Sequence, residues 1–159
     1  MSLQEFINSH PSWFVVIFAC FFVATWCLVV AVISVVGGWF HLSKRFRLDR
    51  PFDGLSEGLQ SGVMRSFAKY ANCLRLGANA EGLYLAVLFL FRFMHPPLFV
   101  PWSEIKVHRQ QRWLFGEYFT LMLGSHPAIP LRITNASATL LKDAAGVHWP
   151  KETGAFSSV

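Results

Sequence analysis

The side chains that commonly do chemistry are present in this sequence, but their spacing matches none of the common catalytic motifs. The six histidines and three cysteines form no HExxH, no CxxC and no other metal-ligand spacing. His95 and His126 each precede a proline, and we expect both to face solvent in turns. The glycines of segment 53–62 lack the lysine and the preceding strand of a phosphate-binding loop, so this segment is interpreted as a flexible connector.

Two carboxylates are the remaining candidates for catalysis. Glu104 and Glu117 fall on neighbouring strand candidates, where a facing pair would support acid–base chemistry. Two separate surface glutamates are the commoner arrangement. We therefore expect a protein that is not an enzyme and has no cofactor and no metal site, with a membrane enzyme that uses these glutamates as an alternative.

Basic side chains form two groups that suit anionic partners. All fourteen Lys and Arg residues lie after position 40, whereas the first forty residues carry one charged side chain, Glu5. The first basic group consists of Lys44, Arg45, Arg47 and Arg50. The second basic group, interpreted as a contact surface of the domain, consists of Arg92, Lys106, His108, Arg109 and Arg112. Anionic lipid suits such groups; the alternatives are charges that only set topology or that solvate a strand edge.

The N-terminal part of the chain is typical of a membrane-spanning helix. Residues 14–36 are 23 consecutive residues without a charge, and the hydrocarbon core of a bilayer needs about 20. Trp13 and Trp39 bracket the segment, as aromatic residues do at the two interfaces. A cleaved signal peptide is the competing interpretation, but the start is acidic and the apolar run is too long. We expect a transmembrane helix over residues 13–40.

The flanking charges predict the orientation of this helix. No Lys or Arg precedes it, and the first basic group follows it. The positive-inside rule therefore places residues 1–12 outside and the rest in the cytoplasm, as expected for a single-pass inner-membrane protein. A basic juxtamembrane connector is expected over residues 41–62. Nucleic acid is not expected as a partner, because the anchor would confine the protein to the membrane.

Small residues recur at alternating intervals of four and three along the apolar segment. They are Cys20, Ala24, Cys27, Ala31, Ser34 and Gly38. Small residues allow close backbone approach between helices in lipid, so this small-residue stripe predicts a partner helix from another subunit or a second copy. The alternative is a chance register, because small residues are common in such helices.

A second apolar segment, residues 83–102, has to be a second span or a buried strand. As a span it would place Arg92 at mid-membrane and break the helix at Pro96 and Pro97. A turn signal precedes the segment, and large apolar residues occupy every odd position from 83 to 93. We therefore predict a strand over residues 83–94.

Further short elements surround this strand. Strand candidates are 72–78, 98–102, 104–113, 117–124 and 128–134, followed by a helix over 135–146 with Asn135 or Ser137 as its N-cap and Gly146 as its terminator. The fold class predicted is one N-terminal transmembrane helix followed by a mainly-β domain with a C-terminal helix, α+β. The domain is expected over 63–146, with a tail over 147–159.

Two short motifs give this β domain a family resemblance. Gly82, Leu83 and Tyr84 open the central strand, and Val100, Pro101, Trp102, Ser103, Glu104 and Ile105 begin a later one. The arrangement resembles the pleckstrin-homology-like superfamily, specifically its GRAM and bacterial PH-like members, over residues 63–146. The resemblance implies a small, partly open barrel capped by a helix and used for membrane or protein contacts. Phosphoinositide binding is not implied, because Arg75 is the sole basic residue between the first two strand candidates.

These observations lead to one functional expectation and one main alternative. We expect a non-catalytic accessory or scaffold subunit of an inner-membrane complex, whose partners are membrane lipids and another transmembrane subunit or a second copy. The alternative is a membrane-anchored regulatory module that binds lipid headgroups through the two basic groups.

Overall fold

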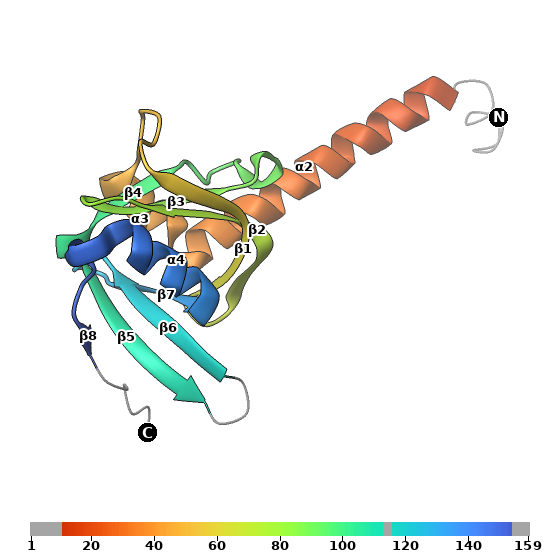
Figure 1. The fold of residues 1–159 in the computed structure, drawn as a ribbon. Helices are drawn as coiled ribbons and strands as arrows, with labels where there is room; N and C mark the ends of the chain where they lie inside the picture. Colours follow the sequence, from red (N-terminus) through yellow and green to blue (C-terminus); the bar gives the residue numbers. More distant parts are fainter. Residues whose placement is uncertain (1–10, 113–115, 154–159) are drawn as a thin grey trace.

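The computed structural model describes residues 11–112 and 116–153, and it shows one long helix that leaves a curled β domain (Figure 1). This helix, α2, runs from Pro11 to Gly37 and is almost entirely exposed. Within the described part of the chain it is the one helix long and apolar enough to cross a membrane, over Ser12–Gly37. The predicted extracytoplasmic segment falls mostly outside the described residues.

The helix breaks at a pair of glycines and enters the domain without a linker. Gly38 has φ of +92°, a left-handed conformation that ends α2, and α3 follows at once over Trp39–Phe46. Three side chains of α3, Trp39, Leu42 and Phe46, lie in the hydrophobic core of the β domain. The interfacial role expected for Trp39 is therefore wrong, since its side chain is fully buried.

Eight strands form one curled sheet in the order β4-β3-β2-β1-β7-β6-β5-β8. Their bounds are β1 Leu55–Met64, β2 Ala68–Ala78, β3 Gly82–Val87, β4 Leu98–Pro101, β5 Ile105–Arg112, β6 Gly116–Leu123, β7 Ile129–Thr134 and β8 Glu152–Thr153. Short 3₁₀ turns occupy Phe89–Phe91 (η1), Trp102–Glu104 (η2) and Gly146–His148 (η3). All neighbouring strands are antiparallel except β5 and β8. The last helix, α4 over Asn135–Ala145, packs on the curled sheet through Ala138, Leu141 and Ala145.

The predicted fold class is confirmed: an N-terminal apolar helix is followed by a mainly-β half-barrel and a C-terminal helix. The strands expected after residue 97 and the helix over 135–146 are present, with Gly146 at the helix end. The N-cap differs, because Thr134 rather than Asn135 or Ser137 caps the helix and accepts from the Ser137 amide. The β domain also extends beyond 63–146, since it includes α3, β1 and β8.

The flexible connector expected over 53–62 is wrong, because most of it is strand β1 (Figure 1). This strand pairs with β2 along its length, but its register shifts between Glu57 and Gln60 and again between Gln60 and Gly62. Leu59, with φ of +59°, lies in this bulged stretch. The bulge interrupts the alternation of apolar and polar residues by which a strand is recognised in a sequence.

The strand predicted over residues 83–94 ends early, at Val87. Both faces of β3 are covered, since all six of its residues are buried. Leu85 pairs with Leu98 of β4, so the chain between them has to leave β3, turn and return. Residues 88–94 therefore form a loop, which contains η1 and which we call the apolar loop.

The two motif segments pair directly with each other. Gly82 lies opposite Pro101 and Leu83 opposite Val100, while the Trp102 indole donates to the Asn79 carbonyl at 2.9 Å. A Cβ added at Gly82 would come within 2.5 Å of the Val100 carbonyl oxygen. Glycine at this position is therefore what allows β4 to approach β3.

We predict that Gly82→Ala lowers the free energy of unfolding by about 1–3 kcal/mol, because β4 has to move to admit the methyl group. Gly58→Ala is the matched control: its added Cβ would meet one atom, the Arg75 Nε at 3.9 Å. Thermal unfolding of both variants in detergent, followed by circular dichroism, measures the difference. Equal midpoints for the two variants would contradict this account of the β3–β4 pairing.

Candidate functional site

The junction between α2 and the β domain contains a buried cluster of three rings. Trp39 of α3, Tyr70 of β2 and His95 of the β3–β4 connection lie with ring centroids 5.2 to 5.8 Å apart. All three side chains are buried. The Trp39 indole donates to the Pro96 carbonyl at 2.9 Å, which ties α3 to the same connection. We call this set the junction cluster.

His95 is buried rather than solvent-facing, which corrects the expectation of a turn histidine. Its Nδ1 lies 3.1 Å from the Phe93 carbonyl and its Nε2 lies 3.0 Å from the Tyr70 hydroxyl. A carbonyl can only accept, so Nδ1–H donates to Phe93 and the neutral ring accepts from Tyr70 at Nε2. Burial lowers the pKa of His95, and burial also raises the pKa of Tyr70.

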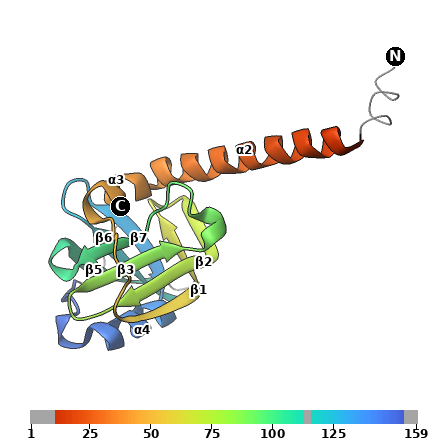
Figure 2. The ribbon, with the colours of Figure 1, turned by 90° about the horizontal axis from the view of Figure 1, so that it is seen from above.

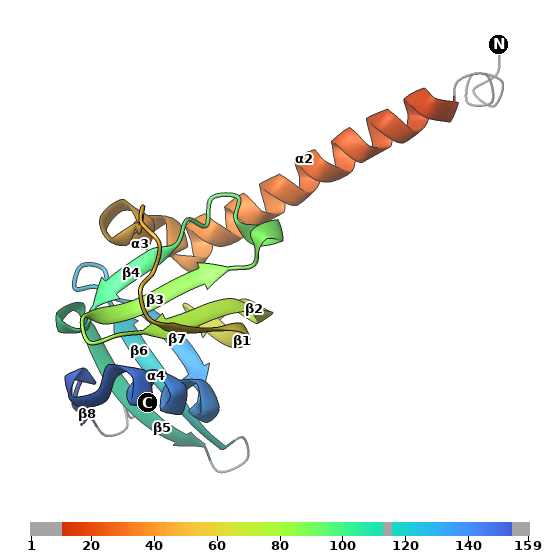
Figure 3. The same cartoon turned by 45° about the horizontal axis from the view of Figure 1, so that its top comes forward.

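The apolar loop lies beside the C-terminal half of α2 (Figures 2 and 3). The Trp26 indole donates to the Leu90 carbonyl at 3.1 Å, and its ring lies 5.4 Å from that of Phe91. The Ser34 hydroxyl donates to the Met94 carbonyl at 2.5 Å. The loop is therefore attached to the helix at two levels. Its outer side chains are apolar and exposed: Phe89, Leu90 and Phe93.

The small-residue stripe is divided by these contacts. Cys20 and Ala24 are exposed and Cys27 and Ala31 are partly buried, whereas Ser34 is fully buried within the chain. Gly38 is also buried, and a Cβ there would come within 2.6 Å of the Ile129 side chain. The last two members of the stripe thus serve an intramolecular contact. The first four remain a predicted surface for another helix.

The first basic group is largely engaged within the chain. Arg45 pairs with Glu104 at 2.6 Å and Arg47 with Asp49 at 2.7 Å. Lys44 lies over the Phe40 ring, 4.7 Å from its centroid. Arg50 is exposed beyond the helix end. This arrangement leaves fewer unpaired cations next to the end of α2 than the sequence suggests.

The second basic group does not form one surface. Lys106 and His108 alternate with Arg109 along β5, so they point to opposite faces of the sheet. Arg109 pairs with Glu117 at 2.7 Å, and His108 lies 2.8 Å from the Thr153 hydroxyl. Arg92 belongs to the apolar loop beside α2. The Arg112 side chain lies outside the described part of the structure.

The two candidate catalytic carboxylates lie at opposite ends of the β5–β6 hairpin. Glu104 precedes the pair formed by Ile105 and Leu123, whereas Glu117 pairs with Gln111. Six residues of extended strand separate the two ends, which is roughly 20 Å. Each carboxylate is bound to an arginine instead, so they form no acid–base pair.

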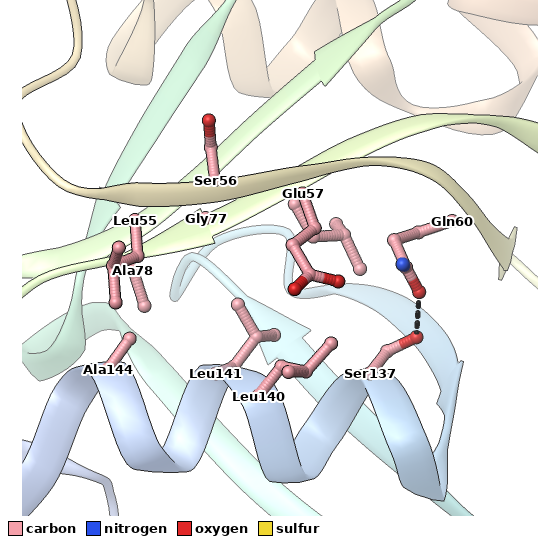
Figure 4. Close-up of a pocket in the computed structure, with 11 residues that line it drawn as sticks. Leu55, Ser56, Glu57, Gln60, Gly77, Ala78, Ser137, Leu140, Leu141 and Ala144 are labelled. Atoms are coloured by element: carbon pink, nitrogen blue, oxygen red, sulfur yellow. Dashed lines mark hydrogen bonds between the residues drawn. The ribbon is translucent and has the colours of Figure 1, made fainter.

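A groove separates the first half of β1 from α4 (Figure 4). It has a volume of about 230 Å³, and apolar side chains of α4 form its floor while the Glu57 carboxylate points toward them. The Ser137 hydroxyl donates to the Gln60 amide oxygen at 2.7 Å at one end. β1 pairs with β7 only over residues 62–64, so the groove runs along the part of β1 that pairs with β2 and has no strand partner on its other edge. Sequence reasoning missed this groove because the pattern over residues 53–62 predicts a connector, whereas the structure has strand β1 there.

Among the described residues no group of three or more His, Cys, Asp or Glu side chains could hold a metal ion. Comparisons with protein-family models, with curated proteins and with solved structures find no match to this chain. The half-barrel with a C-terminal helix is compatible with a PH-like fold in its general layout. The functional argument therefore depends on the geometry of the chain itself.

We predict that the fold loses stability as the pH falls below about 6.5, the pKa of an unperturbed histidine. The pKa of His95 is lower in the folded chain than in the unfolded chain, so the unfolded chain binds more protons at acidic pH. The contribution of neutral, buried His95 to stability is complete above the pKa that this residue has in the unfolded chain, and it decreases as the pH falls below that value. Thermal midpoints in detergent between pH 5 and pH 8 measure this dependence.

The matched pair for this test is His95→Gln and His41→Gln, because His41 is exposed on α3. His95→Gln is expected to flatten the pH profile, and His41→Gln is expected to retain it. A wild-type profile that is flat between pH 5 and pH 8 would contradict the role of His95.

Proposed function

We propose that the chain is a single-pass inner-membrane protein that holds a cytoplasmic PH-like, GRAM-like domain in a fixed orientation as a non-catalytic accessory or scaffold subunit of a membrane complex. In this proposal α2 crosses the bilayer with its N-terminus outside. The first four members of the small-residue stripe, Cys20, Ala24, Cys27 and Ala31, contact a transmembrane partner or a second copy. The domain makes protein or membrane-surface contacts.

The observation that carries the proposal is the joint between α2 and the domain. A module that only needs to stay near a membrane can be attached by a flexible linker. Here α3 follows α2 after a single residue, Gly38, and its Trp39 is fully buried in the core of the domain. The Arg65 guanidinium adds a contact to the Val36 carbonyl at 3.3 Å, at the negative end of the helix dipole. Such a joint supports a function that depends on orientation.

The state of the basic residues distinguishes this proposal from a lipid-headgroup module. A headgroup site requires several free cations that converge on one point. Arg45, Arg47 and Arg109 are each paired with a carboxylate, and the cations of β5 are divided between two faces. This pairing and division of the basic side chains therefore favours a subunit that binds protein over one that binds a lipid headgroup.

The topology is tested with single-cysteine variants in oriented membrane vesicles. Ser158→Cys is expected to react with a membrane-impermeant maleimide from the cytoplasmic side, because the positive flank of α2 follows the helix. Ser2→Cys is the matched control, with labelling from the other side. Labelling of position 158 from the periplasmic side would contradict the cytoplasmic placement.

The scaffold role predicts a complex whose assembly depends on the joint. In mild detergent the wild-type chain is expected to elute with a partner at a mass above that of one chain. Four Gly-Ser residues inserted between Val36 and Gly37 are expected to release the partner while the domain stays folded. The same insertion after Thr153 is the control. A chain that elutes alone in every case would rule out an accessory subunit.

A further inference from the structure

We propose that the apolar loop, residues 88–94, enters the hydrocarbon layer of the bilayer beside α2, so that the β domain has a second point of insertion. The partner of this surface is the lipid itself. The inference rests on the proposed function in one respect, that α2 spans the membrane. It adds that the domain reaches below the membrane surface.

The loop is fixed along the helix by an ordered series of contacts. The carbonyls of Leu90 and Met94 accept from Trp26 and Ser34 of α2. Farther along, the Pro96 carbonyl accepts from Trp39, and Leu98 forms a bridge with Arg47. Increasing residue number in the β3–β4 connection thus corresponds to increasing distance from the N-terminus of α2. The turn at Leu90 is the part that extends farthest along the span.

The length of the span sets the depth of this turn. The apolar stretch begins at Trp13, and the hydrocarbon core needs about 20 residues at 1.5 Å each, so it reaches at least to Val32. Trp26 then lies about 9 Å inside the hydrocarbon layer, and about 16 Å inside when the layer extends to Gly37. Leu90 is hydrogen-bonded to Trp26 at 3.1 Å. If α2 spans the bilayer, the turn at Leu90 therefore lies within the hydrocarbon layer.

The side chains of the loop suit this environment. Phe89 is 77% exposed, Leu90 58% and Phe93 51% within the chain. Three large exposed apolar residues on one short loop are costly in water and favourable in hydrocarbon, at about 25 cal/mol per Å² of apolar surface. A loop with this composition next to an apolar helix is expected to contact the same lipid that surrounds the helix.

Polar backbone groups in lipid need partners inside the protein, and the carbonyls of the loop largely meet this constraint. Among its amides, those of Leu88, Phe91 and Arg92 donate to backbone carbonyls. Six of the seven carbonyls in this described loop accept a hydrogen bond, all except that of Phe91. Three of the donors are side chains, those of Trp26, Ser34 and His95. These donors replace water at positions where a surface loop would bind solvent.

Arg92 is the one charged residue of the loop, and its position is compatible with insertion. It follows Leu90, next to Trp26, and precedes Met94, next to Ser34, so it lies nearer the membrane surface than the turn. Its side chain is exposed. An arginine at this level extends its aliphatic stem through lipid and places the guanidinium among the phosphate groups.

Fluorescence quenching in vesicles tests the inference. Leu90→Cys is made in a chain with Cys20, Cys27 and Cys73 changed to Ala, labelled with the environment-sensitive dye NBD and reconstituted in phosphatidylcholine vesicles. Val23→Cys on α2 is the membrane control. Leu55→Cys, at the end of β1 opposite the joint, is the aqueous control. Spin-labelled acyl chains quench from the lipid and iodide quenches from the water.

The expected result is acyl-chain quenching at Leu90 within about twofold of that at Val23, and little at Leu55. Quenching of Leu90 by iodide while Val23 is quenched by lipid would overturn the inference and leave the spanning helix intact. Protection of position 90 from both quenchers would mean that protein rather than lipid covers the loop, and this result would also overturn the inference. If Val23 itself is not quenched by lipid, the proposed function fails together with the inference.

The cysteine-free background removes a buried side chain, Cys73. A second measurement therefore uses the otherwise unchanged chain with benzoylphenylalanine at Leu90 or at Leu55. Photolysis is expected to attach lipid at Leu90 and none at Leu55. Equal lipid attachment at the two positions, or attachment to protein alone at Leu90, would contradict insertion.

Discussion

The burial of Trp39 is the interaction on which the arrangement of this protein depends. Its indole is buried in the core of the domain, donates to the Pro96 carbonyl and contacts the rings of Tyr70 and His95. It stands two residues after the last residue of the long apolar helix, so the same few residues end α2 and begin the domain core. The orientation of α2 relative to the sheet is consequently a property of the fold and not of a linker.

The β3–β4 connection shows how one segment can serve both parts of the chain. Its first half leaves the sheet with exposed apolar side chains and contacts α2, and its second half carries the buried His95 and the prolines that lead into β4. Hydrogen bonds from Trp26, Ser34 and Trp39 accompany it along its length. Helix and domain therefore share contacts on both sides of the glycine break.

Much of the architecture could be predicted from the sequence, because it follows from local patterns. An apolar run of sufficient length, strands with regular spacing and a helix ended by Gly146 are all local signals. The misassigned parts depend on tertiary partners. Leu59 and its neighbours form a bulge that hides strand β1, and Ser34 is a small residue whose partner is a loop sixty residues away. The sequence pattern likewise cannot distinguish Phe89 in a loop from Leu85 in a strand, since the difference lies in where β4 pairs.

The absence of a linker at Gly38 connects the domain to the thickness of the bilayer. The apolar helix Ser12–Gly37 has 26 residues, which corresponds to about 39 Å, whereas a typical hydrocarbon core is about 30 Å thick. Helices with such a mismatch tilt, and the tilt changes from one membrane to another. With a rigid joint, any tilt of α2 rotates the domain by the same angle. In the proposed arrangement, in which α2 spans a bilayer, membrane composition thereby becomes a factor in which face of the half-barrel lies toward the membrane surface.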